Sequence, residues 1–229
     1  MTENQRQILD PGGRDISFLD EGSGPAIVLV PEAGLDFAYF GALVSILLEE
    51  DFRVVRIRPR RSLSDATIPD LAQDVVDVLD HLSIDDAWIG GHGFGGAVAR
   101  AVALDHHDHV NGILLLGVAD GVPAVDVLDA EVRTVFGDAF APAHDERAHR
   151  YAALDAAERT AWHPVADGTP VLVIQGSADR VTPVDAGESL RASAPGLVSV
   201  KTVEGAGHFF PLTHPGETSW FIEDYLDWD

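Results

Sequence analysis

Asp179 and His208 have the residue types and the surroundings of a general-base pair. Asp179 follows the apolar run Val171–Ile174 in the loop Gln-Gly-Ser-Ala-Asp, and His208 follows the apolar run 198–203 in the loop Glu-Gly-Ala-Gly-His. Short apolar runs bounded by glycine-rich turns are typical of buried strands. Reactive groups of open α/β sheets collect at the carboxyl ends of the strands, so we expect these two side chains to meet. A carboxylate that orients an imidazole makes it an effective proton acceptor.

Gly93 lies at the apex of a sharp turn between a predicted strand and a predicted helix. The stretch Ala87–Ala99 passes from an apolar run through Gly-Gly-His-Gly-Phe-Gly-Gly into a helix-forming segment. Such a turn fits a nucleophile elbow, and its glycines also match the G-x-G-x-x-G pattern of a dinucleotide-binding loop. Asp120, after the next strand, is where a ribose-binding acid would lie. The dinucleotide interpretation is the weaker one, because its fingerprint normally follows the first strand of the fold.

The elements that would position these residues alternate between strands and helices. Strands are predicted at 7–10 and 15–20, joined by a hairpin at 11–13, and then at 26–30, 52–57, 87–90, 112–118, 170–175 and 197–203. Apolar spacing predicts helices at 39–50, 68–82, 94–105, 185–194 and 217–226. Helix 68–82 is the clearest, with Asp70, Asp74, Asp77 and Asp80 outside its apolar stripe. This alternation predicts an α/β fold, a mostly parallel sheet with helices on both faces.

The segment 120–163 interrupts this alternation. It is rich in Ala, Asp and His and predicts helical pieces without a strong strand. We interpret it as a short lid or cap insertion over the sheet, so that 1–119 and 164–229 form the core of a single domain. Four of its residues are candidates for shaping a pocket: His144, His149, Trp162 and His163.

The composition narrows the classes of partner. The 38 acidic and 15 basic side chains give a net charge of −23, which argues against nucleic acid and anionic membranes as partners. The chain contains no cysteine, which excludes disulfides and a thiolate nucleophile. Because no apolar stretch has the length of a membrane span or the form of a signal peptide, we expect a cytoplasmic protein. The sequence sets no expectation for the oligomeric state.

Taken together, these features resemble the α/β-hydrolase fold over nearly the whole chain. The matching pieces are the turn Gly22–Gly24, the stretch Gly91-His92-x-Phe94-Gly95-Gly96, the loop of Asp179 with Val181 and Pro183, and Gly205-x-Gly207-His208. The resemblance implies that Gly93 stands at the nucleophile position and that Asp179 and His208 are triad partners. It also implies that Glu32 and Ala33 lie at the oxyanion-hole turn. His92 and Phe94 would flank the elbow, His92 as a packing residue rather than a catalytic one.

Three departures from the family pattern bear on the chemistry. Gly93 replaces the usual Ser, Asp or Cys; Pro31-Glu32-Ala33-Gly34 replaces a turn that usually contains His-Gly; and Arg58-Pro59-Arg60-Arg61 replaces an acidic and glycine-containing loop. Glycine has no side-chain atom that could attack a substrate, so covalent chemistry at Gly93 is excluded. We therefore expect the Asp179–His208 pair to face an empty space that a water molecule could occupy.

The leading hypothesis is an enzyme that acts on a small organic substrate by His208–Asp179 general-base chemistry, without a covalent serine intermediate. The reaction would be hydrolysis by an activated water, or a proton abstraction of the lyase, isomerase or cyclase type. One alternative is a non-enzymatic descendant that binds a ligand or partner, with no hydrogen bond between Asp179 and His208. Another is an ordinary serine esterase whose nucleophile has been replaced by Gly93. A dinucleotide-binding protein is the least favoured alternative.

Other polar residues carry weaker expectations. We expect Glu32 to be a solvated loop carboxylate; if it were desolvated, its pKa would rise and it could act as an acid. We expect Arg58, Arg60 and Arg61 to be solvated, with a carboxylate-clamping role as the alternative. The run Asp105-His106-His107-Asp108-His109 has the residue types of a metal site, but adjacent ligands diverge. No metal and no cofactor are therefore expected.

Overall fold

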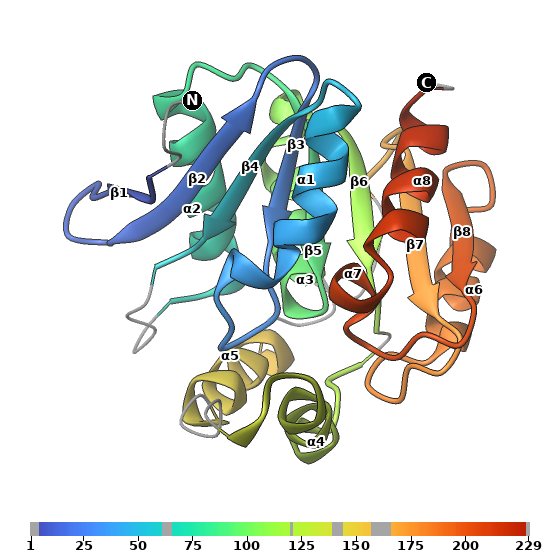
Figure 1. Cartoon of the computed structure of the whole chain (residues 1–229). Coiled ribbons are helices and arrows are strands. Elements are labelled where there is room, and N and C mark those ends of the chain that lie inside the picture. Colours follow the sequence, from blue (N-terminus) through green and yellow to red (C-terminus); the bar gives the residue numbers. More distant parts are fainter. Residues whose placement is uncertain (1–4, 61–65, 120, 139–143, 157–165, 228–229) are drawn as a thin grey trace.

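An eight-stranded sheet forms the centre of the molecule, with helices on both of its faces (Figure 1). The computed structural model describes residues 5–60, 66–119, 121–138, 144–156 and 166–227. The strands are β1 (Gln7–Leu9), β2 (Ile16–Gly22), β3 (Ala26–Val30), β4 (Arg53–Arg58), β5 (Ala87–His92), β6 (Val110–Leu116), β7 (Val171–Gly176) and β8 (Val198–Val203).

The spatial order of the strands is β1-β2-β4-β3-β5-β6-β7-β8. The first two strands form the predicted antiparallel hairpin, and β2 also pairs antiparallel with β4. All pairs from β4 to β8 are parallel. The predicted fold class, a mostly parallel α/β sheet, is confirmed. Because β3, β5, β7 and β8 are parallel, the loops that follow them meet at one edge of the sheet.

The helices and short helical turns are η1 (Phe37–Phe40), α1 (Gly41–Glu49), α2 (Ile68–His81), α3 (Phe94–Asp105), η2 (His107–His109), α4 (Val125–Phe136), α5 (His144–Ala156), α6 (Val184–Ser193), α7 (Phe210–Thr213) and α8 (Pro215–Leu226). Helices α1 and α8 pack together on one face of the sheet, and α2 and α3 pack together on the other (Figure 1). Helices α4 and α5 lie beyond the carboxyl ends of the parallel strands, between β6 and β7 in sequence. Among the described residues of that connection no strand occurs.

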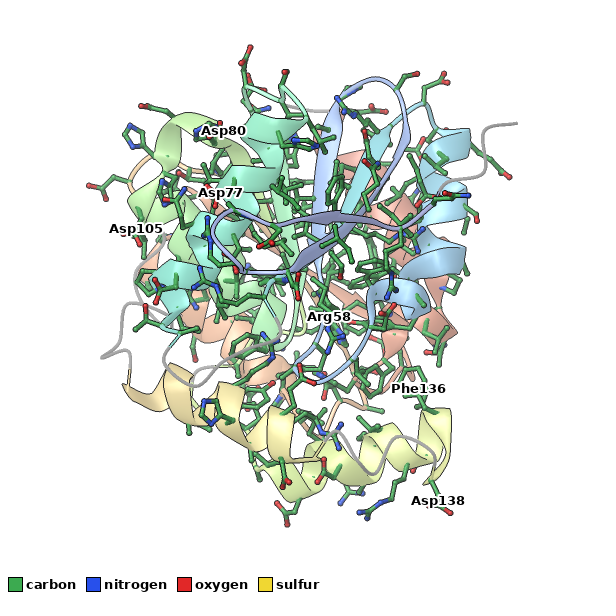
Figure 2. All side chains as sticks on the ribbon, turned by 90° about the vertical axis from the view of Figure 1, so that its left-hand side faces the viewer. Arg58, Asp77, Asp80, Asp105, Phe136 and Asp138 are labelled. Atoms are coloured by element: carbon green, nitrogen blue, oxygen red, sulfur yellow. The ribbon has the colours of Figure 1, made fainter. Side chains whose placement is uncertain are left out.

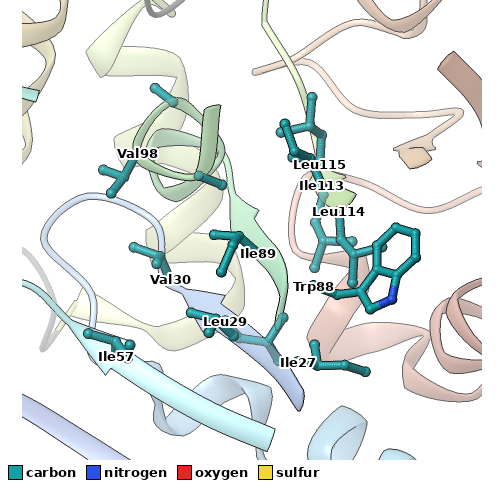
Figure 3. Packing of buried hydrophobic residues seen from close by; sticks show 14 of the residues in the cluster. Ile27, Leu29, Val30, Ile57, Trp88, Ile89, Val98, Ile113, Leu114 and Leu115 are labelled. Atoms are coloured by element: carbon teal, nitrogen blue, oxygen red, sulfur yellow. The ribbon is translucent and has the colours of Figure 1, made fainter. Parts of the chain in front are cut away.

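The core consists of the central strands and the helix faces that cover them. Ile27, Leu29, Ile89 and Leu114 are buried completely, and Figure 3 shows how their side chains pack with those of neighbouring strands. Burying each such side chain contributes about 1.5–3 kcal/mol relative to exposure. Strands covered on both faces need apolar residues at every position, which explains the continuous apolar runs in the sequence.

Helix α2 confirms the predicted helix but corrects one detail of its surface. Thr67 caps its first turn, with Asp70 accepting a hydrogen bond from the Thr67 backbone in return. Asp74, which we expected outside the apolar stripe, is buried completely and forms ion pairs with Arg14 and Arg60. The expectation was wrong because two arginines from other segments reach over the helix and make a buried carboxylate tolerable there. Asp77 and Asp80 lie on the outer side of the helix (Figure 2).

Candidate active site

Asp179 and His208 meet at the carboxyl edge of the sheet, as predicted. His208 Nδ1 lies 3.0 Å from Asp179 Oδ2. The Asp179 carboxylate is held in turn by the backbone N–H groups of Val181 and Thr182, at 2.7 and 2.9 Å, and by the Thr182 hydroxyl at 2.6 Å. Both side chains are fully buried. The non-enzymatic alternative expected no hydrogen bond between the two residues, and the structure contains one.

Glu32 supplies a second carboxylate on the opposite side of the same imidazole. Its Oε2 lies 3.0 Å from His208 Nε2. Its Oε1 accepts hydrogen bonds from the Ala33 N–H at 2.5 Å, from the Tyr151 hydroxyl at 2.8 Å and from the Phe94 N–H at 3.4 Å. Glu32 is only 1 % exposed. The expectation of a solvated carboxylate was wrong, because the turn after β3 directs this side chain inward to the elbow.

The space above Gly93 is filled by that carboxylate. Gly93 has φ +51°, the left-handed conformation of a sharp turn, and begins α3 directly after β5. A Cβ added to Gly93 would overlap Glu32 Oε2 and would lie 2.7 Å from Glu32 Cδ and 3.3 Å from His208 Nε2. The expected empty space for a water molecule is therefore not present. A side chain from β3 has taken the place of the missing side chain after β5.

Two carboxylates determine the protonation of His208. Burial alone lowers its pKa, but the hydrogen bonds and charges of Asp179 and Glu32 outweigh burial and raise the pKa to about 9. Burial alone raises the pKa of Glu32, but the hydrogen bond and charge of His208, with smaller contributions from His92 and the Ala33 N–H, bring it below its ordinary value. The expectation of a raised Glu32 pKa was wrong, because the desolvated carboxylate has a cationic partner. Near neutral pH the site holds an imidazolium between two carboxylates.

His92 lies behind the imidazole of His208 and does not touch the Glu32 carboxylate. Its Nδ1 is 2.9 Å from the Tyr39 hydroxyl, and its Nε2 is 2.9 Å from the carbonyl oxygen of His208. The Tyr39 hydroxyl also accepts a hydrogen bond from the Glu32 N–H at 2.9 Å. Burial, followed by the charge of His208, lowers the pKa of His92 to about 3. His92 is thus a neutral ring that links the backbones of two loops in the site.

A pocket adjoins Glu32 on the side away from His208. It is lined by Val30, Pro31, Glu32, Ala33, Gly34, Leu35, Arg58, Pro59, Phe94 and Arg150. Neither His208 nor Asp179 lines it, and the side chain of Glu32 is itself fully buried. The pocket combines an apolar wall with two arginines, which is a common form of a small-molecule site.

The arginines after β4 are paired rather than solvated. Arg58 donates to both carboxylate oxygens of Glu146 on α5, at 2.9 and 3.1 Å, and Figure 2 shows it on the side of the core that faces α5. Arg150 donates to the same carboxylate at 3.1 Å. Arg60 pairs with Asp74 at 2.7 Å. The expectation of solvated side chains was therefore wrong for Arg58 and Arg60, which pair with carboxylates of this chain. A carboxylate-clamping role for one of the three arginines stays a prediction, and Arg61 lies outside the described residues.

Sequence reasoning did not find Tyr151, Arg150 or Glu146 as site residues. All three lie on α5, and only the helical tendency of the segment was visible in the sequence. Glu146 and Arg150 have the i, i+4 spacing of a helix-stabilising ion pair. This spacing does not indicate which surface of the protein the helix covers. Among the other candidates on this connection, Asp120, Trp162, His163 and the side chain of His144 lie outside the described residues. His149 lies on an exposed side of α5.

Comparison with known structures identifies the fold. The enzyme Est816, described as degrading N-acyl homoserine lactones, matches with a TM-score of 0.78 and 22% identity over 96% of this chain and 100% of its own. A family model of the α/β-hydrolase fold matches residues 51–130. This chain has the α/β-hydrolase fold.

Curated proteins with this fold match part of the chain. Zearalenone hydrolase of Bionectria ochroleuca is 29% identical over 113 residues, which are 45% of this chain and 43% of that protein. Haloalkane dehalogenase 2 of Mycobacterium tuberculosis is 28% identical over 107 residues, which are 44% of this chain and 37% of that protein. The matched region therefore spans about two fifths of the length of these curated relatives. The names of both relatives are those of enzymes.

The glycines of the α/β-hydrolase elbow serve close packing. A Cβ on Gly91 would overlap the backbone carbonyl of Gly95, and a Cβ on Gly95 would overlap the backbone carbonyl of Val30. Both residues therefore let α3 approach β5 and β3 more closely than any other residue type would allow. This requirement accounts for Gly91 and Gly95 without a bound phosphate.

Neither a metal cluster nor a membrane span stands out in the described parts of the chain. No group of three or more potential metal ligands occurs there. In the run Asp105–His109, His107 and Asp108 pair with each other at the surface, with exposed fractions of 76% and 90%. Within the described residues, no helix combines the length and the apolarity needed to cross a bilayer.

Proposed function

We propose that this α/β-hydrolase-fold chain is an enzyme that hydrolyses a small organic substrate without a serine intermediate. Its acid–base chemistry would be carried by His208 with Asp179 behind it and Glu32 in front of it. The observation that supports this most is the continuous hydrogen-bonded chain from Asp179 through His208 to Glu32, a residue that lines the pocket. The pairing is that of a triad in which a carboxylate from β3 faces the imidazole.

The contact between Glu32 and His208 must change before His208 can accept a proton. With a pKa of about 9, the imidazole is already protonated while Glu32 faces it. If the negative charge of Glu32 is moved away or neutralised, one of the two carboxylates that stabilise the imidazolium is lost. His208 would then be able to take a proton from water, with Asp179 holding its other nitrogen.

Charge that develops on the reacting group would be stabilised by donors already in position. The N–H groups of Ala33 and Phe94 point at one oxygen of Glu32, where an oxyanion hole is needed in this fold. Tyr151 adds a hydroxyl from α5. We propose α4 and α5 as the lid predicted for 120–163, since Tyr151 and Arg150 close the site from that side.

The test is hydrolysis of three probes, 4-nitrophenyl acetate, 1-bromobutane and styrene oxide, by the wild type and by His208→Gln and Asp179→Asn. We expect at least one probe to be hydrolysed and kcat/KM to fall at least ~100-fold in His208→Gln. His107→Gln, a change at an exposed histidine, is the matched control and should have no effect. Equal hydrolysis by all four proteins would contradict the assignment.

One observation favours a second candidate, a non-enzymatic binding protein. The carboxylate of Glu32 already occupies the donors that a substrate oxygen would use, and both Glu32 and His208 are buried. A protein whose site is closed by its own side chain in this way would bind molecules in the pocket without converting them. Failure of the wild type to hydrolyse any probe, combined with binding of a carboxylate-free small molecule in the pocket, would support this candidate.

A further inference from the structure

We propose that the pocket beside the turn after β3 is a binding site for a short-chain carboxylate, held by the guanidinium groups of Arg58 and Arg150. The inference goes beyond the proposed hydrolysis, because an anion can bind here without turnover and without His208. Three features support it: the placement of the two arginines, their hydrogen-bond donors without partners, and their surplus of positive charge.

Two arginines from different elements line the pocket together. Arg58 is the last residue of β4, and Arg150 lies on α5, beyond the carboxyl ends of the parallel strands (Figure 1). Strands β3 and β4 are parallel neighbours, so the end of β4 lies beside the turn that follows β3. The side chains of Arg58 and Arg150 are 11% and 4% exposed. Because little water surrounds these two charges, they attract an anion more strongly than charges at an open surface do.

Several guanidinium nitrogens have no hydrogen-bond partner among the described residues. Arg58 donates through Nη2, to both oxygens of Glu146. Arg150 donates through Nε and Nη2, to Glu146 Oε1 and to the carbonyl oxygen of Arg60. Within the described residues, this leaves Arg58 Nε, Arg58 Nη1 and Arg150 Nη1 without partners, and none of the three is an enclosed atom. Since both arginines donate to the same oxygen of Glu146, they are close enough together to bind a second carboxylate.

The two guanidinium groups share one carboxylate, which leaves a surplus of one positive charge. The charges of Arg150 and Arg58 outweigh burial and lower the pKa of Glu146, so this carboxylate is ionised near neutral pH. Burial lowers the pKa of Arg150; Glu146 acts in the opposite direction, but the nearby charge of Arg58 adds to the lowering, and the pKa stays below its ordinary value. A second anion beside the two arginines would therefore stabilise their charged forms further.

The neighbouring carboxylates already have other cationic partners. The side chain of Glu32 is fully buried and lies against the imidazole of His208. Asp74 pairs with two other arginines of the chain. The net charge of −23 repels anions at long range, but at physiological salt the Debye length is about 8 Å, so the nearest charges decide the affinity. At the pocket those charges are the two arginines and Glu146.

The rest of the lining suits a short apolar chain attached to the carboxylate. Apolar side chains line the pocket at Val30, Pro31, Ala33, Leu35, Pro59 and Phe94. The guanidinium carbon of Arg150 lies 5.7 Å from the centre of the Phe94 ring, a contact that orients the planar group. The empty volume is about 230 Å³, including the part open to solvent, which lies below the roughly 300–1,000 Å³ of common ligand pockets. A planar guanidinium matches a carboxylate in shape, so we infer a small monocarboxylate as the ligand.

The test is isothermal titration calorimetry of the full-length chain near neutral pH and at constant ionic strength. The ligands are sodium butyrate, butyramide (which has the same size without the charge) and inorganic phosphate. We expect butyrate to bind at least ~10-fold more tightly than either of the other two. Equal binding of butyrate and butyramide, or no binding of butyrate, would overturn the site. Equal binding of phosphate would overturn the carboxylate as its ligand class.

Two arginine variants on the same strand test where the carboxylate binds. Arg58→Gln should lower the affinity for butyrate at least ~10-fold, because it removes one of the two guanidinium groups. Arg53→Gln is the matched control: Arg53 lies at the other end of β4, pairs with Asp20 and is outside the pocket lining. It removes the same charge and should change the affinity by no more than ~2-fold. Similar losses in the two variants would show that net charge, and not this site, governs binding.

Glu146→Gln gives the opposite sign and leaves both arginines unchanged, so it decides the question even if Arg58→Gln does not fold. Without the charge that repels a second anion, butyrate should bind at least ~10-fold more tightly than in the wild type. Butyrate should also raise the melting temperature more in this variant than in the wild type. Weaker binding in Glu146→Gln would overturn the site. If butyrate does not bind but the hydrolytic probes are turned over, the site fails and the proposed function stands; binding of butyrate without turnover of any probe would have the reverse meaning.

Discussion

Glu32 and Gly93 occupy one another's space: the Glu32 carboxylate fills the volume that a side chain at Gly93 would need. An added Cβ at Gly93 would lie 2.7 Å from Glu32 Cδ, well inside the distance at which carbon atoms touch. The two residues follow neighbouring parallel strands, β3 and β5, so they lie at the same edge of the sheet. The presence of glycine at one position and glutamate at the other is therefore a single structural feature, and each residue requires the other.

Restoring a serine at the elbow alone will not create an esterase. Gly93→Ser adds atoms where Glu32 lies and places a non-glycine residue at φ +51°. We expect unfolding free energy to fall by about 2–4 kcal/mol, from overpacking and backbone strain, and no burst of nitrophenol from 4-nitrophenyl acetate. Urea unfolding and a stopped-flow assay measure the two effects.

The matched test of this prediction is the double variant Glu32→Ala with Gly93→Ser. Removing the carboxylate makes room for the serine, so the second substitution should cost less in this background than in the wild type. Additive losses of unfolding free energy, or prompt ester hydrolysis by Gly93→Ser alone, would show that Glu32 does not occupy the elbow. The latter result would support the hypothesis of an esterase whose serine has been replaced.

Stability should be greatest near pH 6.5. The pKa of His208 is raised to about 9, so its contribution is complete below the ordinary histidine value and is lost as pH rises toward 9. The pKa values of Glu32 and Asp179 are lowered, so their contribution is lost as pH falls through the carboxylate range. The pKa of His92 is lowered to about 3, so its contribution to the stability of the fold is also lost as pH falls below the ordinary histidine pKa.

Urea unfolding between pH 4 and pH 10 measures this profile. The His208 contribution on the alkaline side should amount to roughly 3 kcal/mol, from the difference between the ordinary pKa and about 9. His208→Gln should lose this alkaline decline and should keep the acidic decline that comes from burial of His92, whereas the part from Glu32 and Asp179 should shrink because His208 lowers their pKa values. An unchanged slope above pH 6.5 in His208→Gln would show that the imidazole is not held between two carboxylates.

Tyr151→Phe should slow catalysis more than it lowers stability. The change removes the hydroxyl that donates to Glu32 Oε1 at 2.8 Å and leaves the ring in place. A hydrogen bond to a charged oxygen contributes about 2 kcal/mol, so we expect kcat to fall roughly 10- to 30-fold. Tyr39→Phe, which loses the contacts to the Glu32 N–H and His92, is the comparison and should mainly lower the melting temperature. Equal effects of the two variants on kcat would show that the Tyr151 hydroxyl does not stabilise the charge that develops during the reaction.

Glu146→Gln should loosen the docking of α5. Arg58 and Arg150 both donate to this carboxylate, and both are largely buried. Leaving two buried guanidinium groups without their anion should cost about 3 kcal/mol. Hydrogen exchange should accelerate in residues 144–156 before it does so in the sheet. Glu188→Gln, in a largely exposed pair with Arg191, should change stability by no more than ~0.5 kcal/mol. Similar losses in the two variants would contradict the docking role.

The features that the sequence predicted well are those encoded by local patterns. The parallel strands, the glycine turn at 93 and the pair Asp179–His208 each follow from a short stretch with an apolar run and a defined loop. Their meeting at one edge follows from the parallel topology, because the ends of successive parallel strands coincide. No knowledge of side-chain packing is needed for these conclusions.

The position of Glu32 required tertiary information. The changes at Glu32 and Gly93 were both visible as departures from the family pattern, but treating them separately left a solvated carboxylate and an empty elbow. Only the register of β3 and β5 shows that one fills the other. The conditional expectation for the Glu32 pKa was wrong for the same reason: it considered the effect of desolvation alone and not the imidazolium partner. Tyr151 escaped notice because the packing of α5 depends on contacts with residues more than ninety positions away, such as Glu32.

Titration of His208 by NMR tests the central relationship most directly, because it needs no substrate. In the wild type the ring carbon proton of His208 should titrate with a pKa near 9. In Glu32→Gln, which keeps the shape of the side chain but removes its charge, the pKa of His208 should fall by at least one unit. A His208 pKa near the ordinary value of about 6.5 in the wild type, unchanged in Glu32→Gln, would contradict the account.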